Sequence, residues 1–322
     1  MCLISSVFSP IIVEGREIPL RSQINLLIEA PFGSGKTYLV ERIRQRELGL
    51  IMDRWTENSF YGTITRGGAI IPPMTILGAG KTILIDEFQS IPLHFKQPLL
   101  KLLEEQVVNR QLLNKVYAPT KLERDFYALW AVEGYLWFHI RASYLIVTSH
   151  LGKSHLETML ASRCIVLRFE FTPDDVYYGL ATNLVLDDIA EIREQLKHYQ
   201  GRFNREEDQR YLDLVMQELL NNNIPANYAY RVRDNLIRIE NYIRAMNEIG
   251  YKVKYRAEDF LPIMLAGIKG IKLRPIELDV YGKLPNVDSN ELEYVEILER
   301  KGLVRKVGGI YVRCANFGGG EL

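Results

Sequence analysis

The stretch Ala30-Pro-Phe-Gly-Ser-Gly-Lys-Thr37 constrains the fold of this chain more than any other feature. An apolar run ends just before it and a helical pattern begins just after it. This is the strand, glycine-rich loop and helix order of a phosphate-binding loop. Ala30 stands at the first glycine position of the usual G-x-x-x-x-G-K-[ST] pattern and resembles a tolerated small-residue variant.

Each residue type in this loop has a chemical task. The glycines let successive backbone N–H groups turn toward the phosphates of a nucleotide. Lys36 adds a positive charge, Thr37 offers a hydroxyl to Mg²⁺, and the N-terminus of the following helix favours the anion. The loop therefore predicts ATP and Mg²⁺ as ligands. The residues predicted to bind the nucleotide here are Pro31, Gly33, Ser34, Gly35, Lys36 and Thr37.

An acidic motif follows further along the chain, at Thr82-Ile-Leu-Ile-Asp-Glu87. Four strand-forming residues deliver two adjacent carboxylates to the C-terminal end of a strand, where open α/β sheets place their ligands. We expect Asp86 to hold the Mg²⁺ and Glu87 to orient and deprotonate the attacking water. The alternative is a solvated loop after a strand. With the phosphate-binding loop ahead of it, the motif favours nucleoside triphosphate hydrolysis.

Composition limits the class of protein. The chain has 322 residues, of which 47% are hydrophobic and 25% charged, as in ordinary soluble proteins with two or three domains. The formal net charge is +0, so any nucleic-acid-binding surface must be confined to part of the molecule.

The expected compartment follows from the cysteines and the first residues. Three cysteines without metal-ligand spacing predict a reducing compartment. The interrupted apolar segment 1–13 predicts neither a signal peptide nor a membrane span, so we expect a cytoplasmic protein with no membrane partner.

Hydrophobic periodicity predicts an α/β domain built on a parallel sheet. The expected strands are 24–29, 50–52, 144–147 and 165–171, and the expected helices are 36–48 (with Gly49 as C-cap), 94–105 and 153–161. Two hairpins are expected, one around Gly67-Gly68 and one around Glu133-Gly134.

A helix start at Thr172-Pro-Asp-Asp175 predicts a domain boundary. We therefore divide the chain into a first domain at 1–172, a helical part at 173–261 and a small domain at 262–322. In the last of these, Ser289 is expected to cap a helix that continues to Lys301. Two short strands across Gly308-Gly309 follow, which is the pattern of a winged helix.

Together these residues resemble the AAA+ branch of P-loop ATPases over nearly the whole chain. The stretches 61–69 and 78–88, the second reading Gly-Ala-Gly-Lys-Thr-Ile-Leu-Ile-Asp-Glu-Phe, are similar to MCM replicative helicases, which insert a hairpin in helix 2 before an I-D-E-F motif. The stretch 99–110 resembles MCM proteins and bacterial enhancer-binding activators. The stretch 288–309 looks like the winged helix of the bacterial Holliday-junction branch-migration motor. The resemblance implies a helical lid at 173–261, and it leaves room for a protein partner that supplies the N-terminal DNA-binding domain of a full MCM protein.

The resemblance also implies roles for residues outside the two phosphate motifs. Leu160-Ala-Ser-Arg163 matches the motif whose arginine reaches the ATP of a neighbouring subunit, which implies a ring, by analogy a hexamer. A helix-capping arginine is the alternative for Arg163. The γ-phosphate sensor at the tip of strand 144–147 would be Ser149 or His150. The arginine sensor of the lid would be Arg231 or Arg233.

Two classes of function follow from the resemblance. The first is a DNA motor, a helicase or translocase, in which hairpins and the wing contact DNA. The basic residues expected to contact DNA are Arg66, Lys121, Arg124, Arg141, Arg305, Lys306 and Arg313. The second is a protein-remodelling ATPase of the MoxR or enhancer-binding-activator type, in which the aromatic stretch 126–138 contacts a protein. Stimulation of ATP hydrolysis by DNA discriminates between them.

Overall fold

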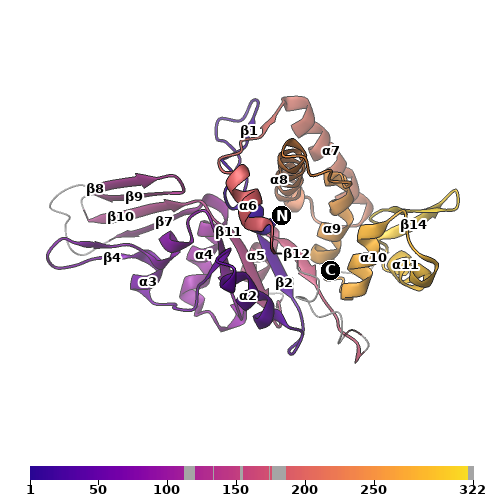
Figure 1. The fold of residues 1–322 in the computed structure, drawn as a ribbon, viewed down its shortest axis with the longest axis horizontal. Helices are drawn as coiled ribbons and strands as arrows, with labels where there is room; N and C mark the ends of the chain where they lie inside the picture. Colours follow the sequence, from indigo (N-terminus) through magenta and orange to yellow (C-terminus); the bar gives the residue numbers. More distant parts are fainter. Residues whose placement is uncertain (112–119, 133, 153–154, 174, 176–185, 318–322) are drawn as a thin grey trace.

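A five-stranded parallel sheet forms the centre of the molecule in the computed structural model, which describes residues 1–111, 120–132, 134–152, 155–173, 175 and 186–317 (Figure 1). Its strand order is β12-β2-β11-β6-β3. The strands are β2 (Leu26–Glu29), β3 (Gly49–Ile51), β6 (Thr82–Ile85), β11 (Ser143–Thr148) and β12 (Ile165–Arg168). Because every neighbouring pair is parallel, all carboxyl ends lie on one edge, called the carboxyl edge here, and all amino ends on the other, the amino edge. The predicted parallel α/β sheet is confirmed.

Helices cover both faces of this sheet. They are α1 (Cys2–Ser5), α2 (Lys36–Gln45), α3 (Glu57–Tyr61), α4 (Leu93–Glu105), α5 (His155–Ser162) and α6 (Ile189–Gln195). Successive side chains of β6 go to opposite faces: Ile83 and Ile85 share a core cluster with α4, whereas Leu84 shares one with α2. Burial on both faces explains why the strands read as continuous apolar runs.

The end of α2 differs from the prediction. The helix stops at Gln45, and Gly49 is not its C-cap but the first residue of β3. The left-handed residue after the helix is instead Glu47, with φ of 57°. Gly49 is constrained by packing, because a Cβ there would lie 2.8 Å from the Leu84 side chain.

A four-stranded antiparallel sheet, the insert sheet, projects from the body of the molecule in the order β7-β10-β9-β8 (Figure 1). Its strands are β7 (Val107–Gln111), β8 (Thr120–Arg124), β9 (Tyr127–Val132) and β10 (Tyr135–Ile140). The hairpin predicted around Gly134 is confirmed. The other predicted hairpin is also present as β4 (Thr63–Ile64) and β5 (Ile70–Ile71), although Tyr61 ends α3 instead of lying in the strand.

The second half of the chain is mainly helical. Its elements are α7 (Arg205–Asn221), α8 (Ala229–Glu248), α9 (Leu261–Lys269), α10 (Pro275–Lys283), α11 (Leu292–Arg300) and the antiparallel strands β14 (Val304–Val307) and β15 (Ile310–Arg313). The helix expected to start at Thr172 runs into residues 174 and 176–185, which lie outside the described residues. The predicted helix capped by Ser289 begins later, at Leu292. A 3-10 turn precedes it, in which the Asp288 N–H donates to the Glu291 carboxylate at 3.1 Å.

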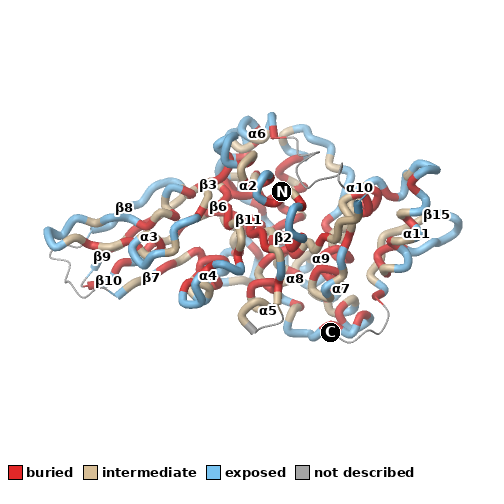
Figure 2. The backbone as a smooth tube through the Cα atoms, turned by 90° about the horizontal axis from the view of Figure 1, so that it is seen from below, coloured by how far each residue is buried: buried red, intermediate tan, exposed pale blue. Residues whose placement is uncertain are grey.

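One core cluster joins residues 11–24 to the helices of the second half. Strand β1 (Ile12–Val13) pairs in parallel with β13 (Arg202–Phe203), a strand in a region expected to be almost all helix. Ile11, Val13 and Ile24 are buried in the same cluster as α7, α8 and α9. Arg16 bridges Asp208 of α7 and Asp234 of α8 at 2.6 and 3.1 Å. The N-terminal segment, assigned to the first domain from the sequence, thus also packs against the helical part. Figure 2 shows that many residues of α8 and α9 are buried. Across the described ranges, no helix has the length and apolar character needed to span a membrane.

Candidate functional site

The phosphate-binding loop connects the carboxyl end of β2 to the N-terminus of α2. Gly33 and Gly35 have φ of 78° and 85°, which only glycine adopts without strain. No atom lies within 4 Å of a Cβ built on either, so the inner side of the loop is open for a ligand. The buried hydroxyl of Ser34 has no hydrogen-bond partner within the described part of the chain. A phosphate oxygen could accept from this hydroxyl, so the loop fits the predicted group.

Lys36 is buried within the loop. Its ammonium donates to the carbonyls of Ala30 and Pro31 at 2.8 and 2.7 Å. Desolvation lowers the pKa of Lys36, and the nearby charges of Glu87 and Asp86 act in the opposite direction. Lys36 and the two carboxylates of the acidic motif therefore lie within electrostatic range of one another. Thr37 is exposed at the first turn of α2.

Glu87 follows β6 with the left-handed φ of 53°. A non-glycine residue in this region costs free energy, and such residues concentrate at functional sites. Ser149 donates to Glu87 Oε2 at 3.2 Å, and Gln89 donates both to Glu87 and, at 3.3 Å, to Ser149. Thr148 in turn donates to Gln89 Oε1 at 2.5 Å. The tips of β6 and β11 are thus joined by a polar chain that fixes the Glu87 carboxylate.

The two predicted sensor positions differ in their contacts. Ser149 contacts Glu87, whereas His150 is exposed and its Nδ1 lies 3.8 Å from Glu29 Oε1. Gln89 was missed in the sequence. Its only signal is its position two residues after Glu87, in the 3-10 turn Phe88–Ser90 that follows the acidic motif.

The two groups predicted to hold Mg²⁺ are Thr37 and Asp86. Asp86 Oδ1 accepts from the Glu87 N–H at 3.0 Å, which leaves its other oxygen for a cation. Among the described residues, no group of three or more His, Cys, Asp or Glu forms a metal cage. A site with only two protein ligands is compatible with Mg²⁺, because this ion usually keeps waters and substrate phosphates in its coordination shell.

An ion pair that the sequence did not reveal lies directly before the loop. Glu29, the last residue of β2, pairs with Arg168 of β12, and the two side chains are only 8% and 15% exposed. Glu29 Oε1 also accepts from the Leu151 N–H at 3.1 Å, and Arg168 donates to the Gly267 carbonyl of α9 at 3.0 Å. The pair therefore joins the start of the loop, the β11 tip and α9.

We expect Glu29→Gln to lower the free energy of unfolding by about 3 kcal/mol, because it leaves the poorly solvated Arg168 charge without a counter-ion. Urea unfolding followed by circular dichroism measures this change. The matched control is Glu41→Gln on α2, whose ion pair with Arg44 is solvent-exposed and should contribute much less to stability. Equal losses in the two variants would show that the buried pair has no special structural role.

Arg163 lies on the amino edge of the sheet, away from the loop. The Asn25 side chain, just before β2, donates to the carbonyls of Leu103 and Arg163 at 3.3 and 3.4 Å. Arg163 pairs with Glu104 at 2.5 Å, and Arg231 approaches the same carboxylate at 3.5 Å. The two arginines predicted to contact a nucleotide are therefore near each other but not near the phosphate-binding loop. Arg233, the alternative to Arg231, pairs with Asp208 and Asp234 instead.

Comparison with known proteins gives no further assignment. No protein-family model matches the chain. A search of curated proteins finds no similar sequence. The site is therefore interpreted from its own geometry.

The residues predicted to contact DNA divide into exposed and structural ones. Arg66, Lys121, Arg124, Arg305 and Lys306 are exposed. Arg141 is not, because it donates to the Asp125 carbonyl at the base of the insert sheet. Arg313 is not either, since it donates to the carbonyls of Tyr281, Gly282 and Leu284. These two arginines stabilise local structure.

The aromatic residues of the insert sheet also divide in two. Phe138 is buried in the core, whereas Trp137 and Tyr135 are 46% and 43% exposed. Cross-strand pairing places Trp137 opposite Trp130, and Trp130 opposite Lys121, in one row on one face. The Lys121 ammonium lies 5.6 Å from the centre of the Trp130 ring. We call this row the tryptophan face.

Proposed function

We propose that the chain is an AAA+ ATPase, similar to MCM proteins, that works as a ring-forming motor on DNA. The observation that carries this proposal is the convergence of three predicted elements on the carboxyl edge. The phosphate-binding loop, Ser149 and the Asp86–Glu87 pair follow the three adjacent strands β2, β11 and β6. A nucleotide at this edge would have hydrogen-bond donors to its phosphates on one side and the Glu87 carboxylate, a general base, on the other.

Each residue of this edge would have a separate role in hydrolysis. ATP supplies the phosphoryl group, and its Mg²⁺ neutralises charge. Lys36 and the loop N–H groups would hold the phosphates, while Thr37 and Asp86 would hold the cation. Glu87 would accept a proton from the attacking water. Gln89 and Ser149 would fix the carboxylate that accepts it, because both donate to Glu87.

The proposed ring rests on Arg163 and Arg231. The four residues of β2 separate the two sheet edges by roughly 13 Å, which is longer than an arginine side chain. Neither arginine can therefore reach a nucleotide at its own loop. A second copy of the chain that places its carboxyl edge against this amino edge would bring them to its phosphates. A closed ring of such heterologous contacts satisfies every subunit, and we propose six subunits by analogy with MCM proteins.

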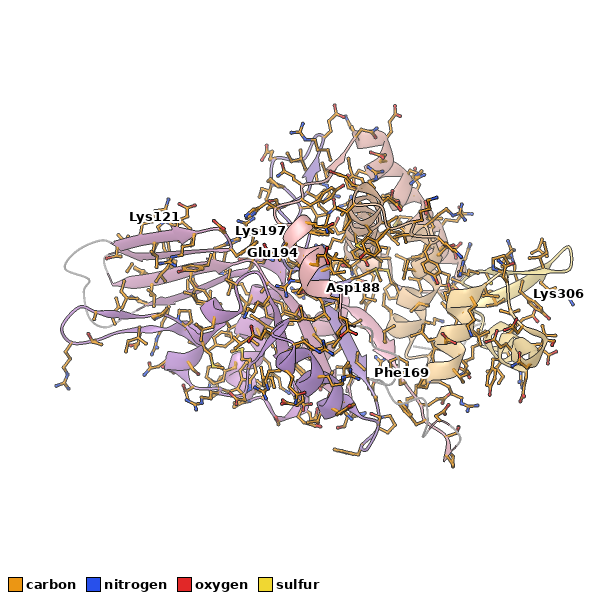
Figure 3. All side chains as sticks on the ribbon, in the orientation of Figure 1. Lys121, Phe169, Asp188, Glu194, Lys197 and Lys306 are labelled. Atoms are coloured by element: carbon orange, nitrogen blue, oxygen red, sulfur yellow. The ribbon has the colours of Figure 1, made fainter. Side chains whose placement is uncertain are left out.

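The remaining elements fit the same proposal. We assign residues 173–261, with helices α7 and α8, as the lid, because α8 carries Arg231. The next helix, α9, contacts the carboxyl edge through the bond from Arg168 to the Gly267 carbonyl. We assign α10, α11 and the strands β14 and β15 as a winged helix. Figure 3 shows Lys121 of the insert sheet and Lys306 of the wing at opposite ends of the molecule. One subunit would thus contact DNA at two separate places.

The deciding experiment is steady-state ATP hydrolysis without DNA, with single-stranded DNA and with double-stranded DNA. We expect DNA to stimulate hydrolysis by the wild-type protein, and we expect no signal from Glu87→Gln, which serves as the blank. Stimulation supports a motor and justifies unwinding assays. Hydrolysis that DNA leaves unchanged would contradict the DNA role, and absence of hydrolysis would contradict the ATPase itself.

A second prediction concerns the tryptophan face. Stacking on an aromatic ring contributes about 1–3 kcal/mol per base, so Trp137→Ala should weaken single-stranded DNA binding roughly tenfold. Lys121→Ala/Arg124→Ala should reduce the magnitude of the salt slope by about 1.4, which corresponds to two lost phosphate contacts. Fluorescence anisotropy with a labelled oligonucleotide at several salt concentrations measures both. Tyr38→Ala, an exposed aromatic on α2, is the control. If Trp137→Ala and this control bind single-stranded DNA with equal affinity, the tryptophan face does not contact the DNA.

The alternative function is a protein-remodelling ATPase of the MoxR or enhancer-binding-activator type. One observation favours it: Lys121 pairs with Glu123 at 2.8 Å on the insert sheet, which reduces the positive charge near the tryptophan face. An aromatic surface with little net charge also suits a protein client. A protein captured by wild type but not by Trp137→Ala, together with DNA-independent hydrolysis, would favour this alternative.

A further inference from the structure

Glu104, the penultimate residue of α4, is the common partner of the two arginines on the amino edge. Its two oxygens are divided between them: Oε2 lies 2.5 Å from Arg163 Nη2, and Oε1 lies 3.5 Å from Arg231 Nη2. The three side chains, called the Glu104 cluster here, come from three elements: α4, the end of α5 and the start of α8. One carboxylate therefore joins two arginines that the sequence places far apart.

The cluster lines a cavity of about 450 Å³ on the amino edge. Arg163 is drawn into it and is only 9% exposed, whereas Glu104 is 46% exposed. Arg163 Nη1 donates to the Met159 carbonyl at 2.9 Å, and its Nε is buried without a hydrogen-bond partner among the described residues. In this position the guanidinium is held by groups of its own subunit and is almost entirely shielded from the molecular surface.

The cavity is lined by more arginines than carboxylates, although Glu105 and Asp234 also line it. Further arginines that line it are Arg16, Arg21 and Arg238. Arg16 is paired with Asp208 and Asp234, but Arg21 Nη1 is buried without a partner in the described structure. Two guanidiniums share the single carboxylate of Glu104, so the cluster keeps a net positive charge. A phosphate oxygen that enters the cavity would compete with Glu104 for the same N–H groups.

We propose that Glu104 is a regulatory residue that holds Arg163 and Arg231 inward in the free subunit and releases them when the nucleotide of a second copy enters the amino edge. This inference rests on the proposed function, because it requires a nucleotide-bearing neighbour. It goes beyond that function by assigning Glu104 as a restraint on assembly. Removal of its charge should therefore make nucleotide-dependent association easier.

The experiment uses the full chain with Glu87→Gln as background, so that ATP is bound but not consumed. Sedimentation velocity measures the protein concentration at half-association, with and without ATP and Mg²⁺. In the presence of nucleotide, adding Glu104→Gln should lower this concentration about two- to fivefold. A shift of this size is expected when partly exposed ion pairs no longer have to be broken. The matched control is Glu105→Gln, the next residue, which lines the same cavity but pairs with Lys101 at 3.7 Å.

A double variant separates release of the arginines from a structural effect. In the Glu87→Gln background with Arg163→Ala, adding Glu104→Gln should change association by less than twofold, because its main partner is already gone. Weaker or unchanged association in Glu104→Gln, with nucleotide-dependent association intact in the background, overturns the role of Glu104 and leaves the proposed function standing. No nucleotide-dependent association in any variant overturns both the ring and the restraint.

Discussion

Replacing Glu87 with glutamine is expected to lower ATP turnover by about 10²–10⁴-fold, the range that a positioned general base contributes. Glutamine has the same shape but cannot accept the proton of the attacking water. Its side-chain oxygen can still accept from Ser149, so the tip of β6 should keep its conformation. Nucleotide affinity should change little, because Lys36 and the loop N–H groups remain.

Two measurements check this expectation. Phosphate release gives the turnover, and equilibrium binding of a fluorescent ATP analogue gives the affinity. Glu47→Gln is the matched control, since Glu47 is an exposed glutamate with nearly the same left-handed φ, 57° against 53°. A loss of binding parallel to the loss of turnover would mean that Glu87 shapes the loop and is not the base.

Replacing Arg163 with alanine is expected to lower ATP turnover by about 10³–10⁵-fold, the range of arginines that stabilise a transferring phosphoryl group. The variant should still bind ATP at its own loop, because Arg163 lies on the opposite sheet edge. Normal binding with lost turnover is expected for a group that acts on the transferring phosphoryl group without holding the nucleotide, as it is for Glu87. Hydrolysis against protein concentration and analogue binding measure the two quantities.

Mixing two inactive variants tests the trans arrangement directly. An Arg163→Ala subunit keeps an intact carboxyl edge, and a Glu87→Gln subunit keeps an intact amino edge. In randomly mixed rings, roughly a quarter of the interfaces combine the two intact edges, so activity should partly return. Arg231→Ala mixed with Glu87→Gln should behave in the same way. If the Arg163→Ala mixture stays inactive, Arg163 is a structural residue of the α5 end, as the capping alternative held.

The central sheet and its phosphate motifs were predictable because their signals are local. Strands buried on both faces leave continuous apolar runs, and the loop and acidic motif each lie within a few residues of a strand end. Hairpins around Gly68 and Gly134 were predictable for the same reason, since both glycines have φ of 85° and mark turns. Ser149 was a candidate because it follows a buried strand directly, and its contact with Glu87 shows that it lies beside the acidic motif.

What the sequence missed depends on contacts between distant residues. Strand β8 is exposed along its whole length and has no alternating pattern, so nothing in its sequence marked it as the edge of a sheet. Glu29 and Arg168 are 139 residues apart, and neither has a sequence context that implies its partner. Gly49 looked like a helix cap because glycine suits that position, yet the close approach of Leu84 determines its place in β3. The role of Glu104 also required the tertiary structure.

The packing of residues 11–24 against α7 and α8 has a consequence for the order of events during protein synthesis. Arg16 and its partner Asp234 are 218 residues apart in the chain. At common translation rates, roughly 10–45 s separate the appearance of the two residues. During that interval Ile11, Val13 and Ile24 have no helices to cover them. The nascent chain therefore presents an apolar N-terminal segment, which a ribosome-associated chaperone would be expected to bind, until the second half of the protein is made.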